Sequence, residues 1–418
     1  MYFEGDAIMI EKMVLVENKS KCCGCGACQQ SCPRNAISMV EDEFGFIYPQ
    51  IDEARCVGCG ACKSVCSFQN PVELKNPIKA YALAAKDDSA IMRAASGGAF
   101  ITLAAEMIHQ GGSVYGAAME KSNDTIAIKH KRVDQLEELK QFQGSKYVQS
   151  DITEVLPLIK NDLLQGKKVM FSGTPCQNAA LKKFLAKEYT NLYTVEIICH
   201  GVPNARLFQD FIKYYEKKLN GTINEFYFRD KSRGQGYITK AIYTTKDNCV
   251  KEKIKPGEQF AYIRFFSKSL ILRENCYECP YAGADRVADI TIGDFWGFDD
   301  VHPAIDQKEH FTIKKGISCL LVNTDRGLEY VSKCQDDFYL LESSFEKVQK
   351  HNEQLKAPTN MPANRQAVLE AYSAEGYNGL EAYYWKHYKS DKLKYKIAEY
   401  IPGDFKNHIK KVVRDVKR

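Results

Sequence analysis

Residues 22–33 read CCGCGACQQSCP, and residues 56–67 read CVGCGACKSVCS. Both segments place cysteines at the spacing C-x2-C-x2-C-x3-C, so the chain carries one motif twice. Glycine and alanine between the cysteines keep each loop small, which lets backbone N–H groups approach whatever the thiolates bind. The duplication predicts two similar metal centres near the N-terminal end.

This spacing is typical of two-cluster bacterial ferredoxins, in which the fourth cysteine of each motif ligates the other [4Fe–4S] cluster. The alternative is structural zinc, which CxxC pairs often bind. Zinc needs only four ligands, however, so two overlapping four-cysteine motifs favour clusters. Cys23 is an extra thiol in the first motif and is not expected to be a ligand. The spacing assigns one cluster to Cys22, Cys25, Cys28 and Cys66, and the other to Cys56, Cys59, Cys62 and Cys32.

The composition is that of a soluble globular protein, with 44% hydrophobic and 27% charged residues. A length of 418 residues predicts more than one domain. The first residues lack a basic stretch followed by an apolar core, so no secretory signal is predicted, and no stretch is long enough to span a membrane. Because cluster-binding thiolates require reducing surroundings, we expect a cytoplasmic protein.

The positive charge is concentrated at the C-terminal end. Residues 386–418 hold 11 Lys or Arg and 4 Asp or Glu, a surplus of +7, which leaves the rest near −2 out of the total of +5. A body without a basic surplus is not expected to bind nucleic acid. Within the tail an amphipathic basic helix is predicted, which could contact a membrane surface or a partner, or pack on its own domain. Its apolar face would hold Phe405, Ile409, Val412, Val413 and Val416.

The middle of the chain alternates between helical and extended patterns, which favours α/β or α+β layering. The predicted helices span residues 96–110, 151–164, 177–187 and 204–219, and the predicted strands or extended segments span 80–85, 113–119, 168–171 and 193–198. The segment from Glu346 onward is predicted to be mostly helical and polar.

A second set of cysteines lies outside the duplicated motif. Cys176 and Cys199 each follow a predicted strand, where α/β folds place functional groups. Cys276 and Cys279 form a CxxC pair that could complete a four-cysteine metal site. The alternative is that Cys176 and Cys199 are buried core thiols. Spacing alone leaves both interpretations open and does not distinguish iron–sulfur from zinc.

Several longer motifs resemble the coenzyme F420 hydrogenase/dehydrogenase beta-subunit family, over roughly residues 78–345. These are SGG at 96–98, GSKYV at 144–148, FSGTPCQ at 171–177, IICHGVP at 197–203, FRDK at 228–231, CYEC at 276–279 and DITIGDFWG at 289–297. Family members carry a flavin, usually FAD, and often a [4Fe–4S] cluster on cysteines matching Cys176, Cys199, Cys276 and Cys279. The resemblance therefore implies FAD and a third cluster.

Together, motifs and resemblance imply an α+β fold with α/β elements. Residues 13–75 would form a ferredoxin-like domain with two [4Fe–4S] clusters, and residues 346–418 a helical, basic tail. Between them would lie a mixed-sheet α/β flavin domain. It would consist of an N-terminal-like family region at residues 76–165 and a C-terminal-like region, with flavin and cluster, at 166–345.

Flavin binding is implied by the resemblance, because no GxGxxG follows a predicted strand. Ser96, Gly97 and Gly98 open a predicted helix whose N–H groups attract phosphate. Alternatively, Ser96 is an ordinary N-cap and the glycines allow close packing. Lys146 could pair with phosphate or an anionic reduced flavin, or be a solvated surface charge. Trp296 could place an aromatic face near the ring, or be a buried core residue.

Candidate catalytic residues lie in the same motifs. His200 could supply a proton, although a packed histidine is an equally simple interpretation. Lys146 could stabilise a reduced flavin, and Asp294 could place a carboxylate near the ring or merely end a strand. Arg229 and Lys231 could meet an acidic substrate, or flank a turn.

Clusters pass single electrons, whereas a flavin exchanges one or two. The sequence therefore favours an iron–sulfur flavoprotein oxidoreductase that passes electrons between clusters and FAD to reduce or oxidise a small-molecule substrate. An electron donor or acceptor such as ferredoxin is the expected partner, and a homo-oligomer is left open. In relatives from methanogens the substrate is the deazaflavin F420, but no residue here identifies a deazaflavin pocket. The alternative is a non-catalytic subunit that relays electrons to a separate enzyme.

Overall fold

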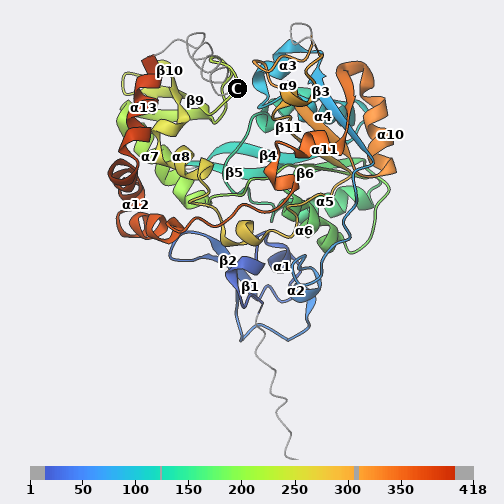
Figure 1. Cartoon of the computed structure of the whole chain (residues 1–418). Helices are drawn as coiled ribbons and strands as arrows, with labels where there is room; N and C mark the ends of the chain where they lie inside the picture. The colour runs from blue at the N-terminus through green and yellow to red at the C-terminus, as the bar shows by residue number, and fades with distance from the viewer. Residues whose placement is uncertain (1–14, 123–124, 306–309, 401–418) are drawn as a thin grey trace, which may run out of the picture.

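A computed structural model describes residues 15–122, 125–305 and 310–400 (Figure 1). An N-terminal module lies at one end of the molecule, beneath a larger mixed α/β body (Figure 1). The expected α+β fold with α/β elements is confirmed. The predicted basic helix around residues 405–416 lies outside the described residues. None of the described helices combines the length and the apolar character needed to cross a bilayer.

The N-terminal module repeats one local structure, as the duplicated motif predicts. In each copy a glycine with φ of 74°, Gly26 or Gly60, precedes a single helical turn. This left-handed conformation costs glycine little, and it lets the chain turn tightly between cysteines. The module comprises η1 (Lys19–Lys21), α1 (Ala27–Gln30), α2 (Ala61–Ser64) and the antiparallel pair β1 (Ile37–Glu41) and β2 (Ile47–Ile51).

An eight-stranded mixed sheet forms the centre of the body, in the order β13-β3-β12-β11-β7-β6-β4-β5. The neighbours β4, β6, β7 and β11 run parallel, so their carboxyl ends meet at one edge. That edge is where open α/β sheets place their ligands. The strands are β3 (Lys79–Ala85), β4 (Ser113–Ser122), β5 (Thr125–Val133), β6 (Val169–Gly173), β7 (Leu192–Ile197), β11 (Ile290–Asp294), β12 (Ser318–Val322) and β13 (Phe338–Ser343).

The helices around this sheet confirm the predicted elements, with shifted ends. The helix predicted from Ser96 begins only at Ala99, because Gly98 has a φ of 87°. The helix predicted from Gln177 begins at Pro175, because Thr174 and Gln177 form a capping box. The elements are α3 (Asp88–Arg93), α4 (Ala99–His109), η2 (Leu136–Phe142), α5 (Val155–Leu164), α6 (Pro175–Leu185), α9 (Phe298–Val301), α10 (Asp325–Lys333), η5 (Gln335–Asp337) and α11 (Phe345–Gln349).

A second lobe stands beside the main sheet (Figure 1). Its three-stranded antiparallel sheet packs with helices around an aromatic core that includes Phe208, Phe211 and Tyr262. The elements are α7 (Ala205–Leu219), β8 (Gly221–Tyr227), β9 (Ile238–Thr245), β10 (Val250–Pro256), η3 (Gly257–Gln259), α8 (Ala261–Ser267), η4 (Glu274–Glu278), α12 (Arg365–His387) and α13 (Lys389–Tyr400). The short η6 (Glu353–Leu355) belongs to the main body, where Leu355 packs in the core beside β3 and β12.

The C-terminal helices are helical as predicted, but α12 is far less polar in its packing than its composition indicates. Tyr372, Tyr377 and Tyr384 bury their rings in the aromatic core. Their hydroxyl groups donate to Asp210, to Glu381 and to the carbonyl of Glu258. A tyrosine has an apolar ring and a polar hydroxyl group, so a sequence pattern does not show whether it is buried. When the hydroxyl group finds a hydrogen-bond partner, the ring can be buried.

One buried ion pair fixes the loop that follows Cys279. The carboxylate of Glu196 on β7 accepts from Arg286 Nε at 2.5 Å, and the two side chains are 0% and 1% exposed. Arg286 also donates to the carbonyls of Tyr281 and Gly283. The pair therefore attaches the CxxC-bearing segment to the main sheet.

We predict that Glu196→Gln lowers the free energy of unfolding by about 3–5 kcal/mol, because it leaves a buried guanidinium without its counter-charge. Denaturant unfolding monitored by circular dichroism measures the change. The matched control is Glu329→Gln, which breaks the exposed pair with Lys333 and is expected to change nothing measurable. Equal stability of the two variants would contradict the assigned role of the pair.

Candidate functional site

The cysteines of the duplicated motif line two cavities in the N-terminal module. The groups match those that the spacing predicts, with each fourth cysteine lining the other motif's cavity; ligation itself stays a prediction. The first cavity is lined by Cys22, Cys25, Cys28 and Cys66, with Cys23 beside them, and the second by Cys32, Cys56, Cys59 and Cys62.

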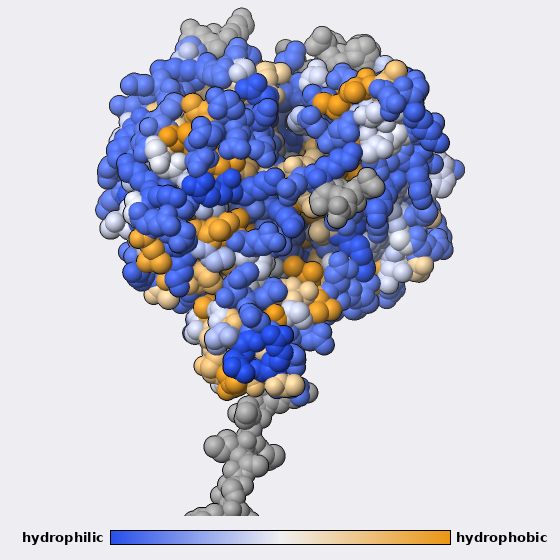
Figure 2. Space-filling model, turned by 180° about the vertical axis from the view of Figure 1, so that it is seen from behind, coloured by the Kyte–Doolittle hydropathy of each residue, from blue (hydrophilic) through white to orange (hydrophobic). Residues whose placement is uncertain are grey.

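The two cavities differ in their surroundings. Cys59 and Val57 at the second cavity are exposed, and hydrophobic residues appear on the surface of this module (Figure 2). Cys25 at the first cavity instead packs against the hydrophobic cluster that contains Val155 of α5 and Leu181 of α6. The second cavity therefore faces solvent and the first faces the body.

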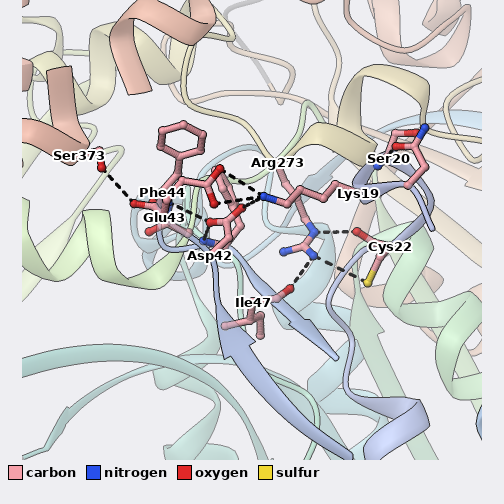
Figure 3. A network of polar contacts seen from close by, with 12 residues as sticks. Lys19, Ser20, Cys22, Asp42, Glu43, Phe44, Ile47, Arg273 and Ser373 are labelled. Atoms are coloured by element: carbon pink, nitrogen blue, oxygen red, sulfur yellow. Dashed lines mark hydrogen bonds and ion pairs between the residues drawn. The ribbon is translucent and has the colours of Figure 1, made fainter. Parts of the chain in front are cut away.

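Side chains of the body hold the first cysteine loop by its backbone. Arg273 Nε donates to the carbonyl of Cys22 at 2.8 Å, as Figure 3 shows. Gln149 Nε2 donates to the carbonyls of Cys23 and Gly24 at 3.0 and 3.1 Å. Tyr281 donates its hydroxyl to the carbonyl of Ser67 on the other side of the cavity, at 3.1 Å. The module is thus anchored to the body around its first cavity.

The structure brings the second cysteine set together at the carboxyl edge of the main sheet. Cys176 follows β6 in the first turn of α6, and Cys199 follows β7. Burial raises the pKa of the Cys199 thiol, and the neighbouring Cys276, Cys176 and Cys279 raise it further, so the four thiols lie close to one another. Within the three described ranges, no three His, Cys, Asp or Glu side chains could hold a single metal ion.

Cys23 connects the first cavity to this second set. Cys23 is buried, and its neighbours Cys176 and Cys25 raise the pKa of its thiol, so the three sulfurs lie close to one another. Cys25 lines the first cavity, whereas Cys176 belongs to the body. The extra thiol of the first motif therefore bridges the two cysteine sets.

A polar cluster lies where the loop after β8 meets the end of β11. Arg229 Nη1 donates to Asp294 Oδ2 at 2.5 Å, and Gln235 Nε2 donates to Asp294 Oδ1 at 2.8 Å. The guanidinium lies 5.5 Å from the ring of Trp296, which is 44% exposed. Arg229 Nη2 is buried and has no hydrogen-bond partner among the described residues. A buried donor without a partner is costly, so this atom favours a ligand here.

Aromatic contacts join the second cysteine set to the polar cluster. His200 follows Cys199, and its ring lies 5.3 Å from that of Phe266. Phe266 stacks on Tyr147 at 4.4 Å, and Tyr147 lies close enough to Arg229 to raise the pKa of its guanidinium. The surface is hollowed between the two lobes (Figure 2).

His200 is held in one protonation state by its neighbours. Gln354 Nε2 donates to His200 Nδ1 at 3.3 Å, so the proton resides on Nε2, which lies 3.0 Å from Ser269 Oγ. Burial lowers the pKa of His200, in agreement with a neutral ring. The ring is oriented to hold a proton on Nε2.

Lys146 is half-buried and hydrogen-bonded rather than solvated. Its Nζ donates to the carbonyls of Phe142, Gln143 and Gly144, at 3.0, 3.0 and 3.3 Å. Burial lowers the pKa of Lys146 to about 7. Three carbonyls account for all three donors of the ammonium, which closes the turn before Tyr147. Contact with a ligand would require one of these bonds to break.

The Ser96 segment is engaged with the sheet instead of capping a helix. Ser96 Oγ donates to the carbonyl of Ile317 at 2.8 Å, and the Gly97 amide donates to Ser318 Oγ at 2.9 Å. A Cβ at Gly97 would lie 2.3 Å from the carbonyl oxygen of Leu83, so glycine is required for close packing. Lys231 Nζ donates to the Ser96 carbonyl at 2.6 Å, which leaves this lysine buried. The Ser96 hydroxyl group, the Gly97 amide and the Lys231 ammonium therefore already donate hydrogen bonds within the protein.

Arg273 and Gln235 were not predicted from the sequence as site residues, and Cys23 was predicted only not to be a ligand. No spacing marks Arg273, which comes three residues before Cys276 and meets the first motif only in the fold. The doubled cysteine at positions 22 and 23 was the one available signal for Cys23.

Comparisons with known proteins identify both parts of the chain. Residues 21–70 match the 4Fe-4S dicluster domain, and residues 166–348 match the family described as the C terminus of the coenzyme F420 hydrogenase/dehydrogenase beta subunit. No curated protein matches the sequence. A chain in the structure of the xenon-derivatised F420-reducing [NiFe] hydrogenase complex from Methanosarcina barkeri is similar, with 15% identity, a TM-score of 0.42 and coverage of 72% of this chain and 94% of that chain. The present protein is an iron–sulfur protein that carries a domain of the coenzyme F420 hydrogenase/dehydrogenase beta-subunit family behind a 4Fe-4S dicluster domain.

Proposed function

We propose that this chain is an iron–sulfur flavoprotein oxidoreductase. It exchanges electrons between its ferredoxin-type [4Fe–4S] clusters and FAD in order to reduce or oxidise a small-molecule substrate. The observation that carries the proposal is the buried thiol of Cys23, which lies beside Cys176 at the sheet edge and beside Cys25 at the first cavity, so that both neighbours shift its pKa upward. This contact gives electrons a continuous path out of the module.

The exposed second cavity is the proposed meeting place with an external electron carrier such as ferredoxin. Val57 is 54% exposed at its rim, and Cys59 is exposed as well. A small apolar rim suits the brief, weak encounters of redox partners. The first cavity, which is covered by the body, then receives or supplies the electron internally.

The donor set at the sheet edge fits a third [4Fe–4S] cluster. Four thiols come from three separate segments, and Arg286 fixes the loop that bears Cys279 through its bond to the Gly283 carbonyl. Thiolates are the ligands that hold such clusters. We propose that Cys176, Cys199, Cys276 and Cys279 hold this cluster.

The polar cluster fits a flavin on two observations. Arg229 Nη2 is a buried donor without a partner among the described residues, and the half-exposed Trp296 ring offers a stacking face beside it. When bound there, FAD would supply the exchange between one-electron and two-electron chemistry. Arg229 would bind an anionic or carbonyl oxygen, Asp294 would hold the guanidinium in place, and His200 would hold a proton on Nε2 near the substrate.

The engaged donors of Lys146 and Ser96 make them weaker candidates than Arg229 for flavin contact. Lys146 would act mainly by shaping the turn that leads to Tyr147, which in turn contacts Arg229. Gly97 and Gly98 would act by letting α4 approach β3, where a Cβ at Gly98 would lie 3.0 Å from that of Ala85.

We predict that Cys23→Ala slows reduction of the flavin without loss of the ferredoxin-type clusters. The full chain is reconstituted anaerobically with iron, sulfide and FAD, and flavin bleaching by a reduced bacterial ferredoxin is followed by stopped-flow absorbance. The expected decrease in rate is about tenfold, equivalent to about 1.4 kcal/mol in the barrier. Cys23→Ser, which keeps a hydrogen-bonding group, should lose less.

The matched control is Cys249→Ala, which removes an exposed thiol far from the motif in sequence. Iron content and the electron paramagnetic resonance (EPR) spectrum show whether the clusters have assembled in each variant. A Cys23→Ala protein with intact clusters and an unchanged rate would contradict the proposed path.

We also predict that Arg229→Gln weakens FAD binding by about 10-fold to 150-fold, because a charge-assisted hydrogen bond contributes about 1.5–3 kcal/mol. Equilibrium dialysis of FAD against the apoprotein measures the affinity, and Arg229→Lys should lose less because it keeps the charge. Arg55→Gln, at an exposed arginine of the N-terminal module, is the control. Equal affinity of Arg229→Gln and the control would place the flavin elsewhere.

A further inference from the structure

Arg273 is a buried cation without a counter-ion. Its side chain is 0% exposed, and no described carboxylate forms an ion pair with it. Its Nη2 donates to the carbonyl of Ile47 at 2.6 Å, its Nη1 to the amide oxygen of Gln149 at 3.4 Å, and its guanidinium lies 4.3 Å from the ring of Tyr48. All of these partners are neutral. Burying an unpaired charge is strongly unfavourable, so a negative neighbour is to be expected.

The carboxylates near this site have another partner. In Figure 3, Asp42 and Glu43 lie beside the guanidinium in the view but pair with Lys19, at 2.8 and 3.3 Å. Lys21, which also lines the first cavity, is half-exposed and pairs with Glu278 at 2.9 Å. Among these groups only Arg273 brings an uncompensated charge to the cavity.

The guanidinium contacts Cys22, one of the cysteines that line the first cavity. Nη2 lies 3.8 Å from Cys22 Sγ, and Figure 3 shows the guanidinium between Cys22 and Ile47. Its charge acts on Cys22 and Cys25, and also on Cys176 and Cys276 of the second set. Arg273 therefore sits where the module meets the sheet edge.

The first loop is shaped to accept this guanidinium. Gly24 has a φ of 65°, and a Cβ there would lie 2.9 Å from Arg273 Nη1. Any side chain would be strained by the backbone and would push the charge away from Cys22. The close approach of loop and cation is thus built into the motif.

The cysteines of the second cavity have no comparable contact, because no described Arg or Lys side chain hydrogen-bonds to any of their sulfurs. The cationic residue that lines this cavity is Arg34, which is exposed. Water and salt screen an exposed charge, whereas a buried charge acts through a medium of low dielectric constant. The two cavities therefore differ in electrostatic environment although their motifs are nearly identical.

We propose that Arg273 is a fixed counter-charge that raises the reduction potential of the cluster held by Cys22, Cys25, Cys28 and Cys66 above that of the other ferredoxin-type cluster. We call the cluster at the first cavity the inner cluster and the cluster at the second, exposed cavity the outer cluster. One electron leaves the outer cluster, which is oxidised, and enters the inner cluster, which is reduced; no bond forms or breaks. The added negative charge is stabilised by the adjacent guanidinium. Electrons that enter at the exposed cavity thus move inward. The direction of flow rests on the proposed function, whereas the difference in potential does not.

The test is an EPR-monitored redox titration of the full chain reconstituted with iron and sulfide. Arg273→Gln removes the charge, and Gln149→Glu places a carboxylate against it at nearly constant shape. Both should lower the inner cluster's potential enough to change its reduced-to-oxidised ratio at least tenfold at a fixed potential, about 59 mV for one electron. Arg273→Lys should shift it less, and the control Arg34→Gln should leave the outer cluster nearly unchanged.

Cys59→Ala and Cys276→Ala identify the signals, because the first should remove the outer cluster and the second any third cluster. An unchanged inner potential in Arg273→Gln with both clusters present would overturn the proposal, as would an equal shift in Arg273→Lys, which would indicate geometry instead of charge. If the Arg273→Gln protein does not assemble the inner cluster, the Gln149→Glu protein decides: an unchanged inner-cluster potential in that variant would overturn the proposal. Failure of the proposed function would appear separately, as a chain that shows these potentials but binds no FAD.

Discussion

The hydrogen bonds that hold the first cysteine loop against the body are the interaction on which the arrangement depends. Arg273 and Gln149 donate to successive backbone carbonyls of that loop, from Cys22 to Gly24. Because the donors come from the body and the acceptors from the module, the cavity and the sheet edge are fixed relative to each other. The buried thiol of Cys23 can then touch both cysteine sets. The hydrogen bonds of the loop join the duplicated motif to the body on the side of the first cavity, together with the hydrogen bond from Tyr281 to Ser67.

The topology of the main sheet explains why the candidate functional residues lie at one edge of the sheet. Cys176, Cys199 and Asp294 lie at or just beyond the ends of β6, β7 and β11, which run parallel. Parallel neighbours bring their carboxyl ends together, so residues distant in sequence become neighbours in space. The loop after β8 then supplies Arg229 from the other lobe. The resulting order, from exposed cavity to inner cavity to sheet edge to polar cluster, is the order in which the proposed path runs.

Local patterns made part of this structure predictable. Cysteine spacing determines which thiols can share a cavity, and the predicted helices and strands of the sheet region follow from apolar periodicity. The grouping of Cys66 with the first motif needed no knowledge of the fold. The start of α4 was misplaced because Ser96 hydrogen-bonds across the sheet to Ile317, a partner far away in sequence. The half-buried position of Lys146 depends on a turn whose carbonyls converge only after folding. Arg273 was not predictable, because its contacts are with residues far away in sequence, namely Cys22, Ile47 and Gln149.

We propose that electrons entering through the ferredoxin-type module reach a flavin in the body. The most direct measurement is an anaerobic titration of the intact chain, loaded with iron, sulfide and FAD, with a reduced ferredoxin as the only electron source. Absorbance spectra separate flavin bleaching from cluster reduction at each addition. We expect the bound flavin to become reduced by electrons delivered in this way. Clusters that become fully reduced while bound FAD stays oxidised, or a chain that retains no FAD, would contradict this proposal.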